Sequence, residues 1–267
     1  MSSIAPSEQS ELVATAHALA DAARTATLRH FRSTDLDIDD KGARGFDPVT
    51  AADREAEDAM REVLAARRPL DGVLGEEAGA TAGESGLTWV IDPIDGTRSY
   101  MSGTPCWGVL IAVSDASGPL FGVIDQPYIG ERFVGGFGRA ELTGPQGRHP
   151  LRCRAPRPLA QATLFTTFPE FDGPEEAAIF RALSGRVRLT RYGLDCYAYA
   201  LVAAGGVDLV VESGLQPYDI HAPIAVIEAA GGLVTDWTGR PARHGGRVLA
   251  AANRQVHAAA LEILAYA

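Results

Sequence analysis

The chain has 267 residues, of which 46% are hydrophobic and 22% are charged. This composition can bury a sizeable core without disulfides, so it excludes disordered and fibrous proteins and predicts one large or two modest domains. The net charge of -10 argues against a general binder of nucleic acids or anionic membranes. No run approaches the roughly 20 apolar residues of a membrane helix. The first residues lack the basic and apolar regions of a secretion signal, so we expect a cytoplasmic protein.

The three cysteines are odd in number and stand far apart. Their spacing matches neither a disulfide framework nor a CxxC metal site. We therefore expect Cys106, Cys153 and Cys196 to be reduced thiols in or near the core.

Hydrophobic spacing predicts two helices in the first third of the chain, over residues 7–31 and from Thr50 to about Pro69. An alternating polar stretch at 35–42 suits a short strand between them. From residue 88 the pattern changes to apolar runs separated by glycine and proline turns, which predicts an antiparallel meander. Its strands are expected at 88–92, 106–113, 120–124 and 132–137.

The glycine- and arginine-rich stretch 138–158 indicates a subdomain boundary. We expect an α+β subdomain over residues 1–145 and an α/β subdomain over 146–267. The second part alternates strands and helices, as α/β folds do. Strands are expected at 162–167, 187–190, 207–211, near 233 and from 248, and helices at 174–183, 196–204, 220–230 and at the end, to 266.

The most informative stretch is an apolar strand that runs into Asp92 and Asp95, on either side of Pro93. Buried acids are costly unless they are paired, protonated or bound to a metal. Pro93 and Gly96 impose a turn that can aim both carboxylates at one point. Oxygen ligands of this kind suit Mg²⁺. The alternative is an Asp turn followed by a capped helix.

Other acids stand at comparable positions. Glu76 and Glu77 follow a short apolar run, and Asp219 stands at the start of a predicted helix. Taken singly, the two glutamates would be surface charges and Asp219 a helix N-cap. Taken together with Asp92 and Asp95, Glu76 and Asp219 can form a carboxylate cage for a cation.

Thr50 and Asp53 have the spacing of a capping box, which by itself only starts a helix. Asp53 with a hydroxyl could instead polarise a water, and composition does not choose between the two. Other catalytic templates fail, because the sequence has no GxxxxGK[ST], HExxH or GxSxG motif and no complete dinucleotide fingerprint.

The acidic motifs, in this order, resemble those of the inositol monophosphatase family of Mg²⁺-dependent, Li⁺-sensitive phosphatases. The matching segments are Gly75–Glu77, Asp92–Thr97, Tyr218–Asp219 and Glu228–Gly232. The combination is highly specific, and the resemblance covers nearly the whole chain. It implies an α/β (α+β) fold, the layered αβαβα sandwich of the inositol monophosphatase and fructose-1,6-bisphosphatase type, and a homodimer.

The resemblance also implies a role for each acid. A first Mg²⁺ would be held by Glu76, Asp92 and the main-chain carbonyl of Ile94, and a second by Asp92, Asp95 and Asp219. A weaker third ion would use Glu76 and waters.

Thr97 and Asp53 match the family's pair that orients the attacking water, so the catalytic set is Asp53, Thr97 and Glu76. A phosphate monoester is dianionic, and bound Mg²⁺ would offset its charge and lower the pKa of a bound water. The amides of Gly96 and Thr97 would hold phosphate oxygens. No phosphoenzyme is needed.

Three departures from the inositol phosphatase pattern look like the histidinol-phosphate phosphatase branch of the family. They lie at residues 98–100, 195–199 and 215–219. We therefore predict hydrolysis of L-histidinol phosphate to L-histidinol and phosphate, in histidine biosynthesis.

A physical argument points the same way. This substrate carries a cationic amine, which Asp195 beside Glu212 could hold by a charge-assisted bond, whereas inositol phosphate offers only hydroxyls. The alternative is that Asp195 only caps the following helix. The expected substrate contacts are Asp95, Gly96, Thr97, Asp195, Glu212 and Asp219.

Three other functions stay open. A phosphatase of the same family that acts on inositol 1-phosphate, or on another small sugar or nucleotide phosphate, would share the metal ligands. A non-catalytic metal-binding module is disfavoured because every expected ligand and the Asp53/Thr97 pair are present. A nucleic-acid-associated factor is disfavoured by the negative charge.

Overall fold

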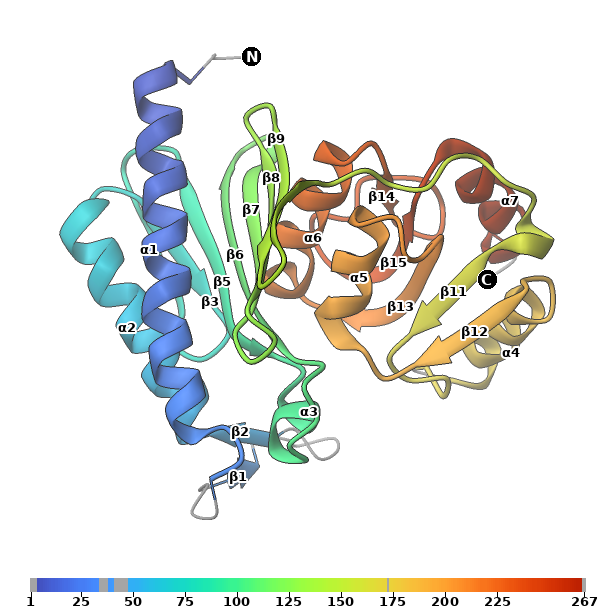
Figure 1. Cartoon of the computed structure of the whole chain (residues 1–267), viewed down its shortest axis with the longest axis horizontal. Coiled ribbons are helices and arrows are strands. Elements are labelled where there is room, and N and C mark those ends of the chain that lie inside the picture. Colours follow the sequence, from blue (N-terminus) through green and yellow to red (C-terminus); the bar gives the residue numbers. More distant parts are fainter. Residues whose placement is uncertain (1–3, 34–37, 41–47, 172, 266–267) are drawn as a thin grey trace.

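The computed structural model describes residues 4–33, 38–40, 48–171 and 173–265, and every structural statement below refers to these residues. They form five layers: two helices, an eight-stranded sheet, two helices, a five-stranded sheet and two helices (Figure 1). The layered αβαβα sandwich that the resemblance implies is therefore confirmed.

The first layer consists of α1 (Pro6–His30) and α2 (Ala51–Arg67). Both lie where the hydrophobic spacing predicts helices. α1 buries its apolar stripe, including Leu12 and Leu19, against the sheet. α2 begins at the predicted capping box, which is confirmed. The short hairpin of β1 (Ile38–Asp40) and β2 (Pro48–Thr50) precedes it, and the rest of the strand predicted at 35–42 lies outside the described residues.

The first sheet has the strand order β10-β9-β8-β7-β6-β5-β3-β4. The predicted antiparallel meander is confirmed from β5 onward, and only the pairing of β3 with β5 is parallel. The strands are β3 (Gly72–Gly75), β4 (Gly79–Thr81), β5 (Thr88–Asp95), β6 (Gly108–Asp115), β7 (Gly118–Gln126), β8 (Glu131–Gly136), β9 (Arg139–Gly144) and β10 (Gly147–Pro150).

The stretch 138–158 contains more structure than a boundary. Residues 139–150 form the hairpin β9–β10, in which Gly144 pairs with Gly147 across a two-residue turn. Its glycines and Pro145 serve this turn, and turn residues alone do not distinguish a hairpin from a connection. The predicted division after residue 145 falls within this turn.

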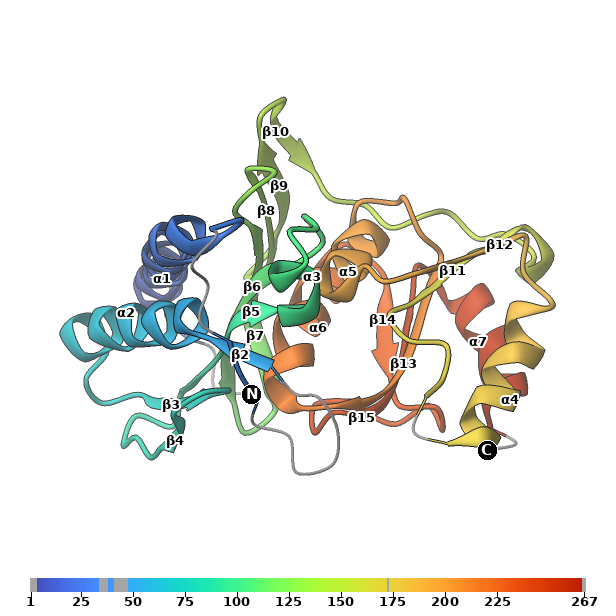
Figure 2. The ribbon, with the colours of Figure 1, turned by 90° about the horizontal axis from the view of Figure 1, so that it is seen from below.

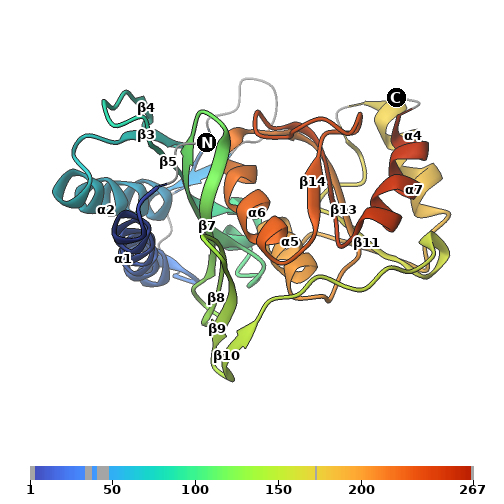
Figure 3. The same ribbon diagram turned by 90° about the horizontal axis from the view of Figure 1, so that it is seen from above.

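The second sheet has the strand order β12-β11-β13-β15-β14. Helices α5 (Asp195–Ala203) and α6 (Pro217–Ala229) lie between the two sheets, and α4 (Pro174–Ser184) and α7 (Arg254–Leu264) cover the outer face (Figures 2 and 3). The strands are β11 (Thr163–Thr166), β12 (Leu189–Tyr192), β13 (Leu209–Leu215), β14 (Leu233–Thr235) and β15 (Gly246–Ala251). A 3₁₀ turn at Leu159–Gln161 precedes β11.

Three hydrophobic clusters fill the spaces between the layers. Strand alternation assigns neighbouring residues to different clusters: Val109 and Ile111 of β6 pack under α1 and α2, whereas Leu110 packs toward α5 and α6. The central strands are thus buried on both faces. Polar residues that carry chemistry are consequently placed where strands end and helices begin.

Two smaller expectations are also tested. Cys106, Cys153 and Cys196 are free thiols, the first half-buried and the others buried, as predicted. In the described part of the chain, no helix combines the length and the apolarity that crossing a membrane requires.

Candidate active site

Asp92 and Asp95 point to the same side of the first sheet because β5 bulges between them. Asp92 pairs with Leu110 and Asp95 with Gly108, so β5 uses three steps where β6 uses two. In a regular strand, residues three apart point to opposite faces. The extra residue reverses this relation. Pro93, which has no amide proton to donate, is tolerated at such a bulge.

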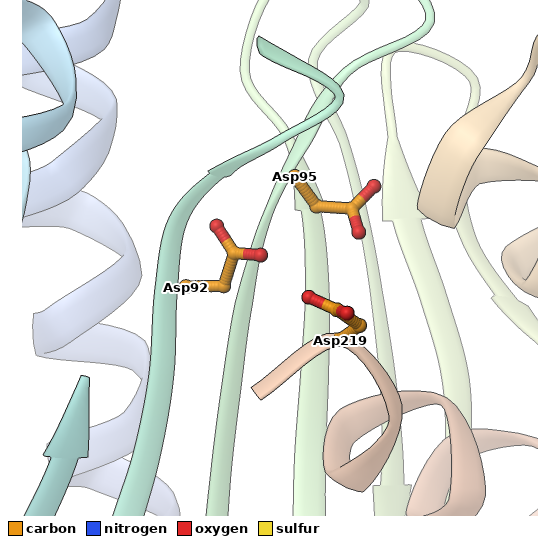
Figure 4. Close-up of side chains that lie close together, drawn as sticks. All are labelled: Asp92, Asp95 and Asp219. Carbon is orange, nitrogen blue, oxygen red and sulfur yellow. The ribbon is translucent and has the colours of Figure 1, made fainter. Parts of the chain in front are cut away.

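Asp219 completes a cluster of three carboxylates. One oxygen from each of Asp92, Asp95 and Asp219 lies within 4.8 Å of the other two (Figure 4). Asp219 is held because its Oδ2 accepts a hydrogen bond of 2.7 Å from the amide of Gln216. The alternative that Asp219 is only an N-cap is wrong: Gln216 is the N-cap of α6, and Asp219 is the third helical residue, whose side chain reaches back.

Crowding and burial shift the acidity of this cluster. Burial raises the pKa of Asp92 well above its ordinary value, and the charges of Glu76 and Asp95 raise it further. Burial followed by the charge of Asp195 does the same for Asp95. Burial raises the pKa of Asp219 to about 6. Without a cation, three ionised carboxylates in this place repel one another.

Main-chain groups of Ile94 lie inside this turn. Its amide donates to Asp92 Oδ1 at 3.0 Å, and its carbonyl accepts from Thr97 Oγ1 at 3.2 Å. Glu76, just after β3, is half-buried and lines the same pocket as Asp92. Its carboxylate is not part of the three-residue cluster.

Asp53 lies beside Thr97, although 44 residues separate them, and Thr97 Oγ1 is 3.5 Å from Asp53 Oδ1. The other oxygen, Oδ2, accepts from the amide and hydroxyl of Thr50 in the capping box. Burial raises the pKa of Asp53 to about 6, against the opposing effect of these bonds. Asp53 therefore caps α2 with one oxygen and faces Thr97 with the other.

Asp195 packs onto the turn that follows β5. Its Oδ2 accepts a hydrogen bond of 2.7 Å from Ser99 Oγ of α3 (Thr97–Met101). Gly96 has a φ of 89°, and a Cβ there would lie 2.9 Å from the carboxylate of Asp195, so only glycine fits. Asp195 itself has a φ of 45°. The alternative that Asp195 caps its own helix is wrong, because Leu194 is the N-cap of α5 and Asp195 is already the first helical residue.

Glu212, on β13, is buried on the opposite wall of the pocket from β5. Its Oε1 accepts from the amide and hydroxyl of Thr167, and its Oε2 accepts from the hydroxyl of Tyr199 at 2.8 Å. Burial raises the pKa of Glu212 to about 7, and the charge of Asp195 contributes to this rise. Asp195 and Glu212 are therefore close enough to interact.

These groups share one pocket of about 640 Å³ between the two halves of the chain. Seven acids and one arginine line it, together with the rings of Phe168, Phe171 and Tyr199. The arginine is Arg98, whose guanidinium lies 4.9 Å from the centre of the Phe168 ring. All expected metal ligands and substrate contacts line this pocket: Glu76, Asp92, Ile94, Asp95, Gly96, Thr97, Asp195, Glu212 and Asp219. Asp53 reaches it through Thr97.

Sequence reasoning missed several residues of this site. Thr167, Tyr199 and Ser99 fix the two carboxylates that stand outside the metal cluster, and no local pattern connects them with those carboxylates. Glu57, which follows Asp53 by one helical turn, is also missed, although that spacing places both on one face of α2.

Comparison with known proteins agrees with this arrangement. The model of the inositol monophosphatase family matches residues 8–266. The chain is 40% identical to the chloroplastic bifunctional phosphatase IMPL2 of Arabidopsis thaliana, over 98% of this chain and 78% of that protein. It is 37% identical to a histidinol-phosphatase of Streptomyces coelicolor, over 91% and 92% of the two chains.

Relatives with another named activity are almost as similar. An inositol-1-monophosphatase of Caulobacter vibrioides is 34% identical over 86% of this chain and 91% of its own. A solved structure of an inositol monophosphatase from Zymomonas mobilis superposes with a TM-score of 0.84 at 37% identity, covering 98% of this chain and all of that one. Sequence, fold and the assembled carboxylates therefore show that the chain belongs to the inositol monophosphatase family of metal-dependent phosphatases.

Proposed function

We propose that the protein is a Mg²⁺-dependent phosphatase that hydrolyses L-histidinol phosphate to L-histidinol and phosphate, in histidine biosynthesis. The observation that carries the choice of substrate is the place of Asp195. Its carboxylate stands in the pocket wall against Gly96 and Ser99, outside the cluster of Asp92, Asp95 and Asp219. Relatives that are named histidinol-phosphatase support the choice.

The residues present fit Mg²⁺. The cluster offers only carboxylate oxygens, and their burial and mutual repulsion leave a demand for positive charge that a hard dication meets. We propose that Glu76, Asp92 and the carbonyl of Ile94 hold one ion, and that Asp92, Asp95 and Asp219 hold a second. A third ion at Glu76 would bind more weakly. Mg²⁺ bound there would offset the charge of the phosphate and lower the pKa of a bound water.

The chain's own groups then orient the reaction. Thr97 Oγ1, placed between Asp53 Oδ1 and the carbonyl of Ile94, directs the attacking water at the phosphorus. Asp53 is ionised at neutral pH, because its pKa is about 6, and so it accepts the proton through Thr97. The amides of Gly96 and Thr97 hold phosphate oxygens. The water oxygen forms the new bond to phosphorus as the bond to the substrate oxygen breaks, without a phosphoenzyme, and the leaving oxygen takes a proton from solvent to give the alcohol.

The rest of the pocket suits a cationic leaving group. With every carboxylate ionised, the seven acids and one arginine leave the pocket with a net charge of -2 after two Mg²⁺ ions bind, before a phosphate dianion enters. A substrate with a protonated amine offsets part of that charge, whereas a polyol does not. We propose that Asp195 and Glu212 hold the amine. Phe168 and Phe171 offer apolar surface to the imidazole.

Phosphate release from L-histidinol phosphate, inositol 1-phosphate and fructose 1,6-bisphosphate tests the proposal. Each substrate is assayed with Mg²⁺, with a chelator and with added Li⁺. We expect Mg²⁺-dependent turnover with a preference for histidinol phosphate of at least about a hundredfold in kcat/KM, about 2.7 kcal/mol. Equal or better turnover of inositol 1-phosphate would favour the second candidate function, which the Caulobacter relative supports, and would remove the role of Asp195 in amine binding.

We propose two further properties, the first because the resemblance to the family implies it. The protein forms a homodimer, which light scattering coupled to gel filtration measures directly. It is located in the cytoplasm, which fractionation of the source cells tests.

A further inference from the structure

Glu57 is a buried acid that the mechanism above does not use. It lies one turn after Asp53 on α2, and both residues are 1% exposed. A carboxylate at such a position requires partners that satisfy its charge. Its partners are the residues that follow Glu76.

The carboxylate of Glu57 binds two consecutive backbone amides. Oε2 accepts from the amide of Glu77 at 2.7 Å, and Oε1 accepts from the amide of Ala78 at 3.0 Å. Oε1 also accepts from Arg61 Nε at 2.8 Å. Hydrogen bonds to an ionised acceptor are short and strong, so this arrangement fixes the turn that carries Glu76.

Arg61 forms further hydrogen bonds with the residues that follow this turn. Its Nη2 donates to the carbonyl of Gly79 at 2.6 Å, and its Nη1 lies 3.4 Å from Thr81 Oγ1. Glu57 and Arg61 on α2 therefore hold the turn after β3 through its amide donors and β4 through its acceptors. Figure 2 shows α2 lying beside β3 and β4.

Gly75 explains how the carboxylate comes so close to the backbone. A Cβ at this position would lie 2.3 Å from Glu57 Oε1 and 2.6 Å from its Cδ. Any side chain there would push the carboxylate away from the amides of Glu77 and Ala78. The carboxylate of Glu57 therefore both requires glycine at position 75 and holds the amides of Glu77 and Ala78.

From this geometry we propose that Glu57 is a positioning residue for Glu76. It touches neither metal nor substrate. It sets the position of the Glu76 carboxylate in the pocket by holding the backbone of the next two residues, Glu77 and Ala78. The proposal rests on the proposed function in one respect, namely that Glu76 binds Mg²⁺. Loss of such a supporting contact typically costs 10–100-fold in metal affinity.

The test compares Glu57→Gln and Glu57→Asp with two controls on the same helix. Gln keeps the shape but turns an amide donor toward one of the backbone donors, and Asp keeps the charge but is one methylene short. Leu64→Ala controls for lost stability, because Leu64 is buried on α2 away from the turn. Asp58→Asn controls for lost charge at an exposed position.

Three measurements are made on each variant: the Mg²⁺ concentration for half-maximal phosphate release, Mn²⁺ binding followed by electron paramagnetic resonance, and hydrogen exchange at the amides of Glu77 and Ala78. For Glu57→Gln we expect a rise of roughly tenfold or more in the half-saturating Mg²⁺, a matching loss of Mn²⁺ affinity and faster exchange at both amides. Glu57→Asp should lie between Gln and the unchanged protein. Arg61→Gln should shift the same quantities less, and it serves if Glu57→Gln does not fold.

The outcomes separate this proposal from the function. A shift below about twofold in Glu57→Gln, or an equal shift in Leu64→Ala, would overturn the positioning role while the phosphatase assignment stands. Absence of Mn²⁺ binding and of turnover in the unchanged protein would overturn the proposed function itself.

Discussion

The amide of Cys196, at the start of α5, donates a hydrogen bond of 2.8 Å to Oδ1 of Asp95, at the end of β5. One carboxylate thus caps a helix in the second half of the chain and belongs to the acidic cluster that Asp219 completes. The two halves are joined at the site itself. The two roles can be separated by substitution, because an amide oxygen still accepts a hydrogen bond.

Asp95→Asn should remove activity without removing the fold. Asn keeps an acceptor for the amide of Cys196 but loses the charge that Mg²⁺ requires, so we expect kcat/KM to fall by roughly a thousandfold or more. Asp95→Ala should lose activity equally and also be less stable than Asp95→Asn by about 1 kcal/mol, since it lacks the cap. Phosphate release and urea unfolding measure the two effects. A fully active Asp95→Asn protein would contradict the metal assignment.

Removal of Mg²⁺ should lower thermal stability. Binding at a hundred times the dissociation constant contributes about 2.7 kcal/mol. For a chain of this size the melting temperature should therefore rise on the order of 5–10 °C over the value with chelator. The rise should disappear in Asp92→Asn, whose melting temperature in chelator should not fall below that of the unchanged protein, because the repulsion around Asp92 is relieved. Asp58→Asn, an exposed change, should keep the full rise. An unchanged rise in Asp92→Asn would place the cation elsewhere.

Asp195→Asn should change which substrate is preferred. Asn tolerates the left-handed φ of 45° and can still accept from Ser99, so it removes the charge and little else. Ala at this position would add backbone strain and confuse the result. We expect kcat/KM to fall at least about tenfold for histidinol phosphate and less than about threefold for inositol 1-phosphate. Equal losses for both substrates would mean that Asp195 does not bind the amine.

Glu212→Gln should alter how stability depends on pH. The pKa of Glu212 is raised to about 7 from 4.5, so the folded protein binds more protons than the unfolded chain between these values. The free energy of unfolding therefore falls as pH rises through this window. Gln does not titrate. The free energy of unfolding of the variant, relative to that of the unchanged protein, should therefore increase by on the order of 3 kcal/mol from pH 4.5 to 7 and stay constant above pH 7.

Urea unfolding in chelator at pH 5, 6, 7 and 8 gives that difference in stability. Any stability that Gln loses through the hydrogen bonds to Thr167 and Tyr199 is independent of pH, so it does not affect the slope of the difference against pH. Glu62→Gln, at an exposed position of α2, provides a matched control for the loss of one carboxylate. A flat difference for Glu212→Gln would show that burial does not hold its proton.

The sequence predicts those parts of the fold that depend on residues close together in the chain. The spacing of Leu12 and Leu19 on α1, and the box at Thr50 and Asp53, are read directly from neighbours in the sequence. The resemblance, rather than any spacing, connected Asp53 with Thr97 across 44 residues. The hairpin β9–β10 is not distinguished from a boundary by sequence, because its turn residues are also those of a linker.

The remainder depends on contacts that no window of sequence contains. Glu212 is held by Thr167, 45 residues away, and Glu57 by amides about 20 residues away. Such pairs are set by how the layers pack, after each element has formed. The motif around Asp92 indicated which side chains gather, but the hydrogen bonds that hold Asp195 and Glu212 came only from the structure.

The bulge in β5 makes this site sensitive to the number of residues more than to their kind. Ile94 contributes main-chain atoms there, so its side chain has no direct part in the cluster. Removal of one residue between Asp92 and Asp95 would eliminate the bulge: the two acids, then two positions apart, would still point to one face, but the turn that holds the amide and carbonyl of Ile94 beside them would be lost. Such a chain would keep every acid but lose the main-chain contacts of Ile94 that fix Asp92 and Thr97. Among related sequences, the length of this interval is therefore a stricter criterion for a working phosphatase than the identity of the residues that fill it.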